Sequence, residues 1–185
     1  MRLRNLFLAL LFFPAIPLAA QLGGRDPLNQ KEIDELREVA QEPDRRLKLM
    51  VEFARARLAA IDRLRGEPRL AAGRGNQVHD LLEDFTKLVD EMGDNIDDYL
   101  DRKYDLRKAL KFVIEGDTEF QAKLRTLKEQ GAGAGAKPGS EIGDYTFALQ
   151  NATEAVNLSL DDSRKLLEEQ ETAFKDAKEK AKKKK

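Results

Sequence analysis

Carboxylates are the side chains of this sequence whose number and spacing most resemble a chemical site. Between positions 80 and 101, Lys87 is the only base among nine acidic residues: Asp80, Glu83, Asp84, Asp90, Glu91, Asp94, Asp97, Asp98 and Asp101. Clustered carboxylates suit hard cations, but the run lacks the EF-hand spacing and its turn glycine. All nine fall on helix positions opposite a predicted apolar seam. We therefore expect a solvated acidic face; weak divalent-cation binding and attraction of a basic protein partner are the alternatives.

The remaining inventory of catalytic side chains is small. The chain has no cysteine, no tryptophan and one histidine, which excludes thiolate zinc sites and cysteine nucleophiles. We expect His79 to be a packing residue beside the seam rather than a base or a pH sensor. The Glu-x-x-His motif of di-iron bundles is excluded, because position 76 is Asn76 and no second histidine exists. We predict no catalytic, cofactor-binding or metal-binding residues, and no enzymatic activity.

Two polar residues, Lys103 and Asp117, occupy seam positions where apolar side chains are expected. Buried polar groups at such positions can fix register and partner choice. The alternative for Lys103 is that its ammonium group reaches the surface along an apolar stem. A small-ligand or divalent-cation sensor, our second functional hypothesis, would need a polar pocket near Lys103, Tyr99 and Tyr104.

The C-terminal end, residues 175–185, contains seven lysines beside Asp176 and Glu179. Such a run can contact an anionic lipid surface, at about 1 kcal/mol per lysine. The alternative is a frayed, solubilising helix end whose cations favour the helix dipole. The run has no interleaved aromatic residues, so we expect no nucleic-acid partner. Glycosylation sequons at Asn151 and Asn157 lie inside a predicted helix, which favours chance matches.

The first 20 residues have the pattern of a secretory signal peptide. Arg2 and Arg4 precede an apolar stretch from Leu6 to Leu18, and two alanines follow. We expect cleavage after Ala20 and a mature chain in the periplasm or outside the cell. The net charge of −1 for the whole chain then separates into −8 for residues 21–174 and a basic tail at 175–185. The nearly neutral total is an average of two opposed regions.

The rest of the chain follows helical periodicity. Asn29 with Glu32 has the sequence of a capping box, and Pro43 is expected to break or kink the first helix. A second apolar stripe runs from Leu47 to Leu64, and glycines and Pro68 mark a loop over 66–75. A heptad seam then continues across about fifty residues: Val78, Leu82, Phe85, Val89, Met92, Ile96, Tyr99, Lys103, Leu106, Leu110, Val113, Asp117, Phe120, Leu124 and Leu127.

Because this register passes through Gly116 unchanged, we predict one continuous helix over 76–130. Residues 131–140 are a flexible linker rich in glycine and alanine, and a last helix covers about 141–180. The fold class is therefore all-α: an elongated antiparallel helical bundle of three to four helices in three long layers, with coiled-coil-like heptad packing. The bundle domain covers 21–174.

Residues 81–124, LLEDFTKLVDEMGDNIDDYLDRKYDLRKALKFVIEGDTEFQAKL, resemble uncharacterised exported all-helical proteins of acidobacterial type. The resemblance implies a bacterial envelope location and carries no activity. Together with the long seam and the segregated charge, it favours a non-enzymatic interaction, scaffold or chaperone-like module. We expect a protein partner or self-association through helical surfaces.

Overall fold

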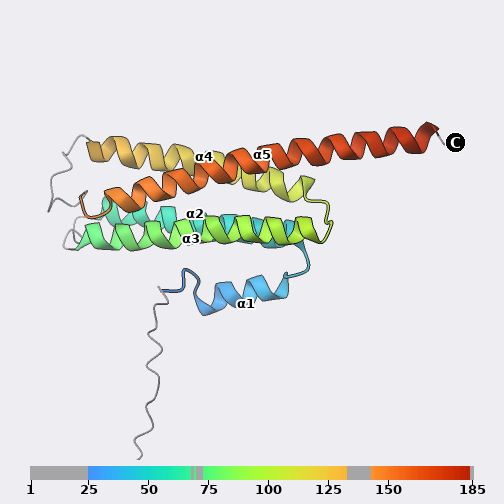
Figure 1. Ribbon diagram of the computed structural model, residues 1–185. Helices are drawn as coiled ribbons and strands as arrows, with labels where there is room; N and C mark the ends of the chain where they lie inside the picture. Colours follow the sequence, from blue (N-terminus) through green and yellow to red (C-terminus); the bar gives the residue numbers. More distant parts are fainter. Residues whose placement is uncertain (1–24, 68, 70–72, 133–142, 184–185) are drawn as a thin grey trace, which may run out of the picture.

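The computed structural model describes residues 25–67, 69, 73–132 and 143–183, and every regular element in these ranges is a helix (Figure 1). The prediction of an all-α protein is confirmed. The helices are α1 (Gln30–Glu38), α2 (Pro43–Gly66), α3 (Arg74–Asp101), α4 (Arg107–Ala132) and α5 (Thr146–Lys183). The predicted signal peptide, residues 1–20, lies outside the described residues. Of the predicted linker, residues 133–140 also lie outside them, and Gly131 and Ala132 belong to α4.

The N-terminal helix boundaries agree with the sequence signals. The Asn29 side chain accepts a hydrogen bond from the Glu32 backbone, and the Glu32 carboxylate accepts one from the Asn29 backbone, which completes the capping box. Pro43 is the first residue of α2, where its missing N–H leaves no helical hydrogen bond unmade. The chain therefore turns between α1 and α2 where proline was expected to break it.

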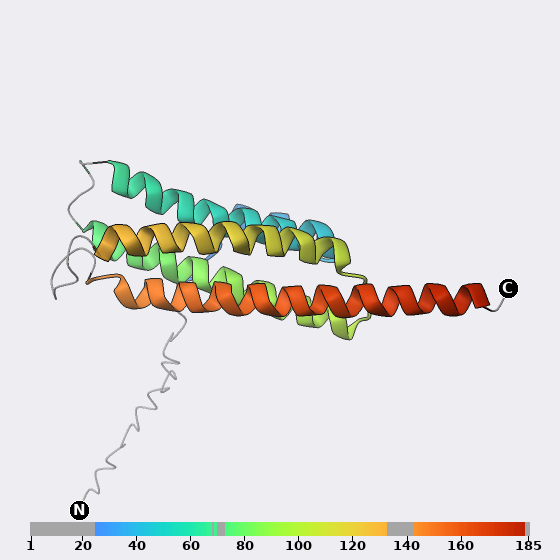
Figure 2. The same cartoon turned by 90° about the horizontal axis from the view of Figure 1, so that it is seen from above.

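The four long helices pack as a closed ring in the order α2, α3, α5, α4. Figures 1 and 2 show α2 and α4 running in one direction and α3 and α5 in the other. The consecutive helices α3 and α4 thus lie at opposite corners of the ring. Of the long helices, the short helix α1 packs mainly against α2.

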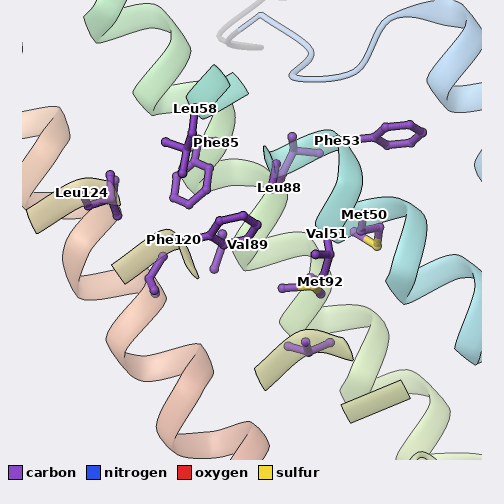
Figure 3. Packing of buried hydrophobic residues seen from close by; sticks show 14 of the residues in the cluster. Met50, Val51, Phe53, Leu58, Phe85, Leu88, Val89, Met92, Phe120 and Leu124 are labelled. Atoms are coloured by element: carbon purple, nitrogen blue, oxygen red, sulfur yellow. The ribbon is translucent and has the colours of Figure 1, made fainter. Parts of the chain in front are cut away.

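The core fills the space inside this ring with large apolar side chains. Phe85 of α3 and Phe120 of α4 meet across it edge to face, with ring centroids 5.2 Å apart. Figure 3 shows Met50, Val51 and Leu58 of α2 on one side of this contact. Burial of such side chains contributes about 1.5–3 kcal/mol each, so the ring of helices is held mainly by its interior.

The prediction of one continuous helix over 76–130 is wrong at residues 102–106. There α3 ends in a Schellman motif: the N–H of Lys103 donates to the Leu100 carbonyl at 2.9 Å, and that of Tyr104 donates to the Tyr99 carbonyl at 3.0 Å. Lys103 takes the required left-handed conformation, with φ +66°. The rings of Tyr99 and Tyr104 make the accompanying apolar contact.

The heptad did not reveal this turn because both arms bury the same kind of face. Spacing of apolar residues constrains each helix separately and is silent about the direction of the chain between them. The three-layer arrangement depended on the unbroken helix, and four long helices replace it. Continuity through Gly116 is confirmed, since this residue lies inside α4.

Gly116 has a packing role that sequence reasoning did not find. A Cβ atom at this position would lie 2.6 Å from Cγ1 of Val51 on α2. The absence of a side chain therefore lets α4 approach α2 closely.

The end of α5 extends beyond the other helices (Figures 1 and 2). All residues from Thr172 to Lys183 are exposed. The predicted boundary at 174/175 falls inside this single helix, so the lysine-rich tail continues α5 as far as Lys183.

Candidate functional site: the groove between α3 and α5 and the buried Asp117

An open groove of about 240 Å³ lies between α3 and α5, and we refer to it as the α3–α5 groove. Small, partly or fully buried residues line it: Gly93, Ala155, Ser159 and Ser163. Four exposed carboxylates surround these residues: Asp90, Asp94, Asp97 and Asp162. Leu158 also borders the groove, with 64% of its surface exposed. At about 30 Å³ per water molecule, the groove holds roughly eight waters, the space of one or two side chains.

The four carboxylates of the groove are not neutralised within the described residues. No lysine or arginine there makes an ion pair with any of them; the neighbouring Asp98, outside the groove, pairs with Arg102. Partial burial raises the pKa of Asp90 above its ordinary value, and repulsion from Asp94 raises it further. The groove therefore presents a negative potential beside apolar surface, which suits a cation carried on an apolar stem.

Asp117 lies behind the groove, in the interior of the bundle. It has no exposed surface, and its Oδ2 accepts a hydrogen bond of 2.7 Å from the hydroxyl of Ser159. Its Oδ1 has no hydrogen-bond partner among the described residues. Burial raises the pKa of Asp117 from 3.8 to about 6, against the opposing effect of the Ser159 hydrogen bond.

Ser159 connects these two features, because it lines the groove and donates its proton to the buried carboxylate. In the relay of a serine hydrolase a third group orients the base, whereas among the described residues Asp117 has no hydrogen-bond partner besides Ser159. The arrangement instead fixes one rotamer of Ser159 and one contact between α4 and α5.

The acidic run is mostly the solvated face that the heptad predicts. Seven of its nine members are exposed and Glu91 is half-buried, whereas Asp84 is buried. Arg25 reaches Asp84 from the segment before α1 and forms an ion pair with it. The prediction of a solvated carboxylate is wrong at Asp84, because a residue 59 positions away covers it. No group of three or more histidine, cysteine or acidic side chains placed to hold a metal ion occurs among the described residues.

His79 lies near the start of α3 with its ring half-exposed. Its nitrogens are 3.7 Å from Asp80 and 3.8 Å from Glu83, both on the same helix. The structure therefore places His79 beside acidic residues of its own helix.

Lys103 does not occupy the apolar seam, either as a buried side chain or with its stem packed there and its ammonium group at the surface. It is exposed in the turn after α3. The seam assignment of Lys103 is wrong for the same reason as the continuous helix. Tyr99 is buried, and its hydroxyl donates to the Ala40 carbonyl at 2.7 Å. The tyrosines thus pack the helix end and do not line the polar pocket that the sensor hypothesis required near Lys103.

The lysine-rich end is helical as far as Lys183 and exposed. Asn151 and Asn157 both lie inside α5, as expected for chance sequons; the side-chain oxygen of Asn157 accepts a hydrogen bond from Gln121. None of the helices in the described part of the chain combines the length and the apolar character that a membrane span requires.

A buried ion pair near the N-terminus was also missed by the sequence reasoning. The two terminal guanidinium nitrogens of Arg57, Nη1 and Nη2, donate to Glu32 at 2.8 and 2.6 Å, and Nη2 also donates to the Pro27 carbonyl. Burial opposes ionisation of Glu32, but the hydrogen bonds from Arg57 and Asn29 outweigh it and lower the pKa. Only the capping box pointed to Glu32, and nothing in the local sequence pointed to Arg57.

No protein-family model, curated protein or solved structure matches this chain.

Proposed function

We propose that this chain is a non-enzymatic exported helical protein that works by binding a protein partner in the bacterial envelope, as an interaction, scaffold or chaperone-like module. The observation that carries the proposal is the end of α5, where the helix continues past the bundle with every residue from Thr172 to Lys183 exposed. A helical segment as short as Thr172 to Lys183 is only marginally stable in water when it lacks tertiary contacts. A partner that packs on this end would supply the missing tertiary contacts.

Two further features support binding over catalysis. Asp117, the carboxyl whose pKa burial raises to about 6, is fully enclosed, so no substrate meets it in this conformation. The exposed charges are segregated, with carboxylates along α3 and lysines at the end of α5. Segregated charge favours electrostatic association with complementary surfaces. We further propose that the long helices pack in the coiled-coil manner predicted from the heptads.

Export rests on the sequence of residues 1–20, and the envelope location follows from it. The lysine-rich end then has an additional candidate contact, the anionic surface of a membrane, at about 1 kcal/mol per lysine.

The proposal is tested by capturing partners with the chain that begins at Gln21, tagged and crosslinked in the envelope fraction of the source bacterium. A variant that ends at Glu171 lacks the exposed end of α5 but keeps every buried residue of the core. We expect specific proteins to be captured by the longer chain and lost with the shorter one. Capture of nothing above an unrelated tagged helical protein, or turnover by the purified chain against a broad substrate panel, would sink the proposal.

The second candidate function is a small-ligand or divalent-cation sensor. The observation that favours it is the acidic α3–α5 groove, which attracts cations although no described acidic side chains there are grouped to hold a metal ion. Isothermal calorimetry with Mg²⁺ and with a linear diamine tests it. Heat and a raised melting temperature, both abolished in Asp94→Asn/Asp162→Asn, are expected if the groove binds such cations. If the calorimeter records no heat and the melting temperature does not change, the sensor function is excluded.

A further inference from the structure

The α3–α5 groove is lined by carboxylates and the exposed end of α5 is rich in lysine, although both belong to the same chain. We propose that the exposed end of α5 from a second copy of this chain docks into the α3–α5 groove. This inference rests on the proposed function, since it names the partner of the same surfaces. It identifies one occupant, and its failure can be separated from the failure of the broader proposal.

The groove needs cations that its own chain does not provide. Asp90, Asp94, Asp97 and Asp162 make no ion pair within the described residues. A run of lysines that make no ion pair within the described residues lies at the end of α5, which is a single helix from Thr146 to Lys183. At 1.5 Å per residue, the middle of that end lies about 27 Å along the helix from the middle of the groove. Because α5 does not bend back (Figures 1 and 2), the lysines must come from another copy.

The end of α5 has the surface that such a groove accepts. Ala173, Ala177 and Ala181 follow one another at every fourth residue and form a stripe of small side chains along one side of the helix. Lys178 and Lys180 flank this stripe on its two sides. The groove repeats the pattern with opposite charge, because small residues lie between carboxylates of α3 and of α5. Small residues on both surfaces allow the helix axes to come close, which brings each lysine to a carboxylate.

A membrane surface fits this end less well than a second copy does. Helices that lie in a membrane interface bury a face of large apolar residues. From Thr172 to Lys183 the only large apolar residue is Phe174, and the guanidinium of Arg107 already stacks on its ring at 3.7 Å. The alanine stripe offers little apolar area to lipid but fits a narrow groove between helices.

Two copies in antiparallel orientation satisfy both grooves at once. The centres of the groove and of the exposed end are separated by roughly 18 residues of the same straight helix, so a twofold axis passes beside its midpoint, near Glu169. Each end then lies over the groove of the other copy, and the interface is closed and self-complementary. The unsupported turns of α5 gain tertiary packing in this dimer.

A charge exchange between the two surfaces tests the inference in the chain that begins at Gln21. The groove variant is Asp94→Lys/Asp162→Lys, and the end variant is Lys178→Glu/Lys180→Glu. We expect the wild-type chain to dimerise in sedimentation equilibrium at low salt, and more weakly at about 1 M salt, where the Debye length is about 3 Å. For each variant alone, the dissociation constant of the dimer should be at least about tenfold higher than for the wild type. A mixture of the two should dimerise again, because both contacts of the mixed pair regain opposite charges.

Glu38→Lys/Glu115→Lys is the matched control, since it changes the charge equally at exposed positions outside the groove. It should dimerise like the wild type, and circular dichroism and thermal unfolding should show all variants folded. A monomeric wild-type chain at low salt, or a mixture that fails to dimerise when both variants are folded, overturns the inference. Binding of a monomeric wild-type chain to phosphatidylglycerol vesicles assigns the lysines to a membrane and overturns it too. If the mixture dimerises but the crosslinking experiment captures no other protein, self-docking is supported, and only the proposal of a partner other than this chain fails.

Discussion

Asp117 is the residue at which the interior departs most from an apolar core. Its carboxyl has no exposed surface and one hydrogen-bond partner, Ser159, while Oδ1 is unpaired among the described residues. Burial of a charge with so little compensation destabilises a fold. The group lies between two helices, α4 and α5, so its protonation state bears on the contact that supports the α3–α5 groove.

The raised pKa makes the contribution of Asp117 depend on pH. The carboxyl ionises near 3.8 in the unfolded chain and near 6 in the folded one. The folded protein therefore retains this proton as pH rises from 4 to 6. Its stabilising contribution is fully present below the unfolded pKa and is lost as pH rises through the folded pKa. Two pKa units correspond to about 3 kcal/mol.

Asp117→Asn removes this titration while keeping the shape of the side chain. We expect the free energy of unfolding of this variant, relative to that of the wild type, to increase by about 2–3 kcal/mol between pH 4 and pH 7, because only the wild type loses stability there. Urea titrations at the two pH values measure the difference. Ser159→Ala is the companion variant: loss of the hydrogen bond that lowers the pKa should make the pH dependence steeper. A constant difference between Asp117→Asn and the wild type would contradict the assignment.

Helix ends carry the next level of specificity, and the turn from α3 to α4 illustrates it. Lys103 occupies the left-handed position of the Schellman motif, where residues with a Cβ atom are disfavoured by about 1–2 kcal/mol. Glycine has no such penalty there but is more flexible when unfolded.

Lys103→Gly should therefore stabilise the protein by about 0.5–1 kcal/mol in chemical unfolding. Arg102→Gly is the matched control, because Arg102 has φ −81° and gains nothing from glycine; it should destabilise by about 0.5–1 kcal/mol. Equal effects of the two substitutions would show that the turn does not require the left-handed conformation at Lys103.

The close approach of α4 to α2 beside Val51 depends on Gly116. Gly116→Ala should raise helix propensity by about 1 kcal/mol, but its Cβ would meet Val51 at 2.6 Å. We expect net destabilisation by about 1–3 kcal/mol, as for other overpacked cores. Thermal and urea unfolding measure it.

Gly93→Ala provides the comparison for Gly116, since nothing lies within 4 Å of a Cβ added there. It should stabilise the protein by about 0.5–1 kcal/mol. In the pair Val51→Ala/Gly116→Ala, the clash disappears, so the double variant should be more stable than the sum of the single effects implies. If Gly116→Ala behaved like Gly93→Ala, the close approach of the two helices would be disproved.

In the molecule as a whole, stability and interaction lie in different regions. The buried residues fill the ring of four helices and reach no further along α5 than Ser163. The last twelve described residues of α5 contribute exposed charge and a small-residue stripe instead. The end of α5 therefore extends from the bundle, which it touches through the contact of Phe174 with Arg107.

Removal of residues 172–185 takes away the contact of Phe174 with Arg107 and, within the described part of the chain, no buried residue, so it should lower the free energy of unfolding of the chain by no more than about 1 kcal/mol. Helical signal in circular dichroism should fall, because the exposed turns are lost. Leu160→Ala, in the buried part of the same helix, should by contrast destabilise by about 2–5 kcal/mol. A large loss of stability on truncation would mean that the exposed end packs on the bundle.

The sequence by itself determined most of the helical residues and which faces they bury, but not the turn at residues 102–106. The capping box at Asn29, the start of α2 at Pro43 and the exposure of most of the acidic run were all predicted from local spacing. These features follow from the period of the helix and from the hydrogen bonds of its first turn. They involve residues a few positions apart, so a pattern read along the chain is sufficient.

Only the tertiary structure decided which faces meet. Ser159 and Asp117 are 42 positions apart, and Arg25 and Asp84 are 59 apart. The candidate groove likewise combines residues of α3 and α5, and its existence depended on the chain reversing at Lys103 instead of continuing. The physical reason is that apolar periodicity fixes the buried side of each helix but not its direction or its neighbour, which are set by the packing of all four helices around one core.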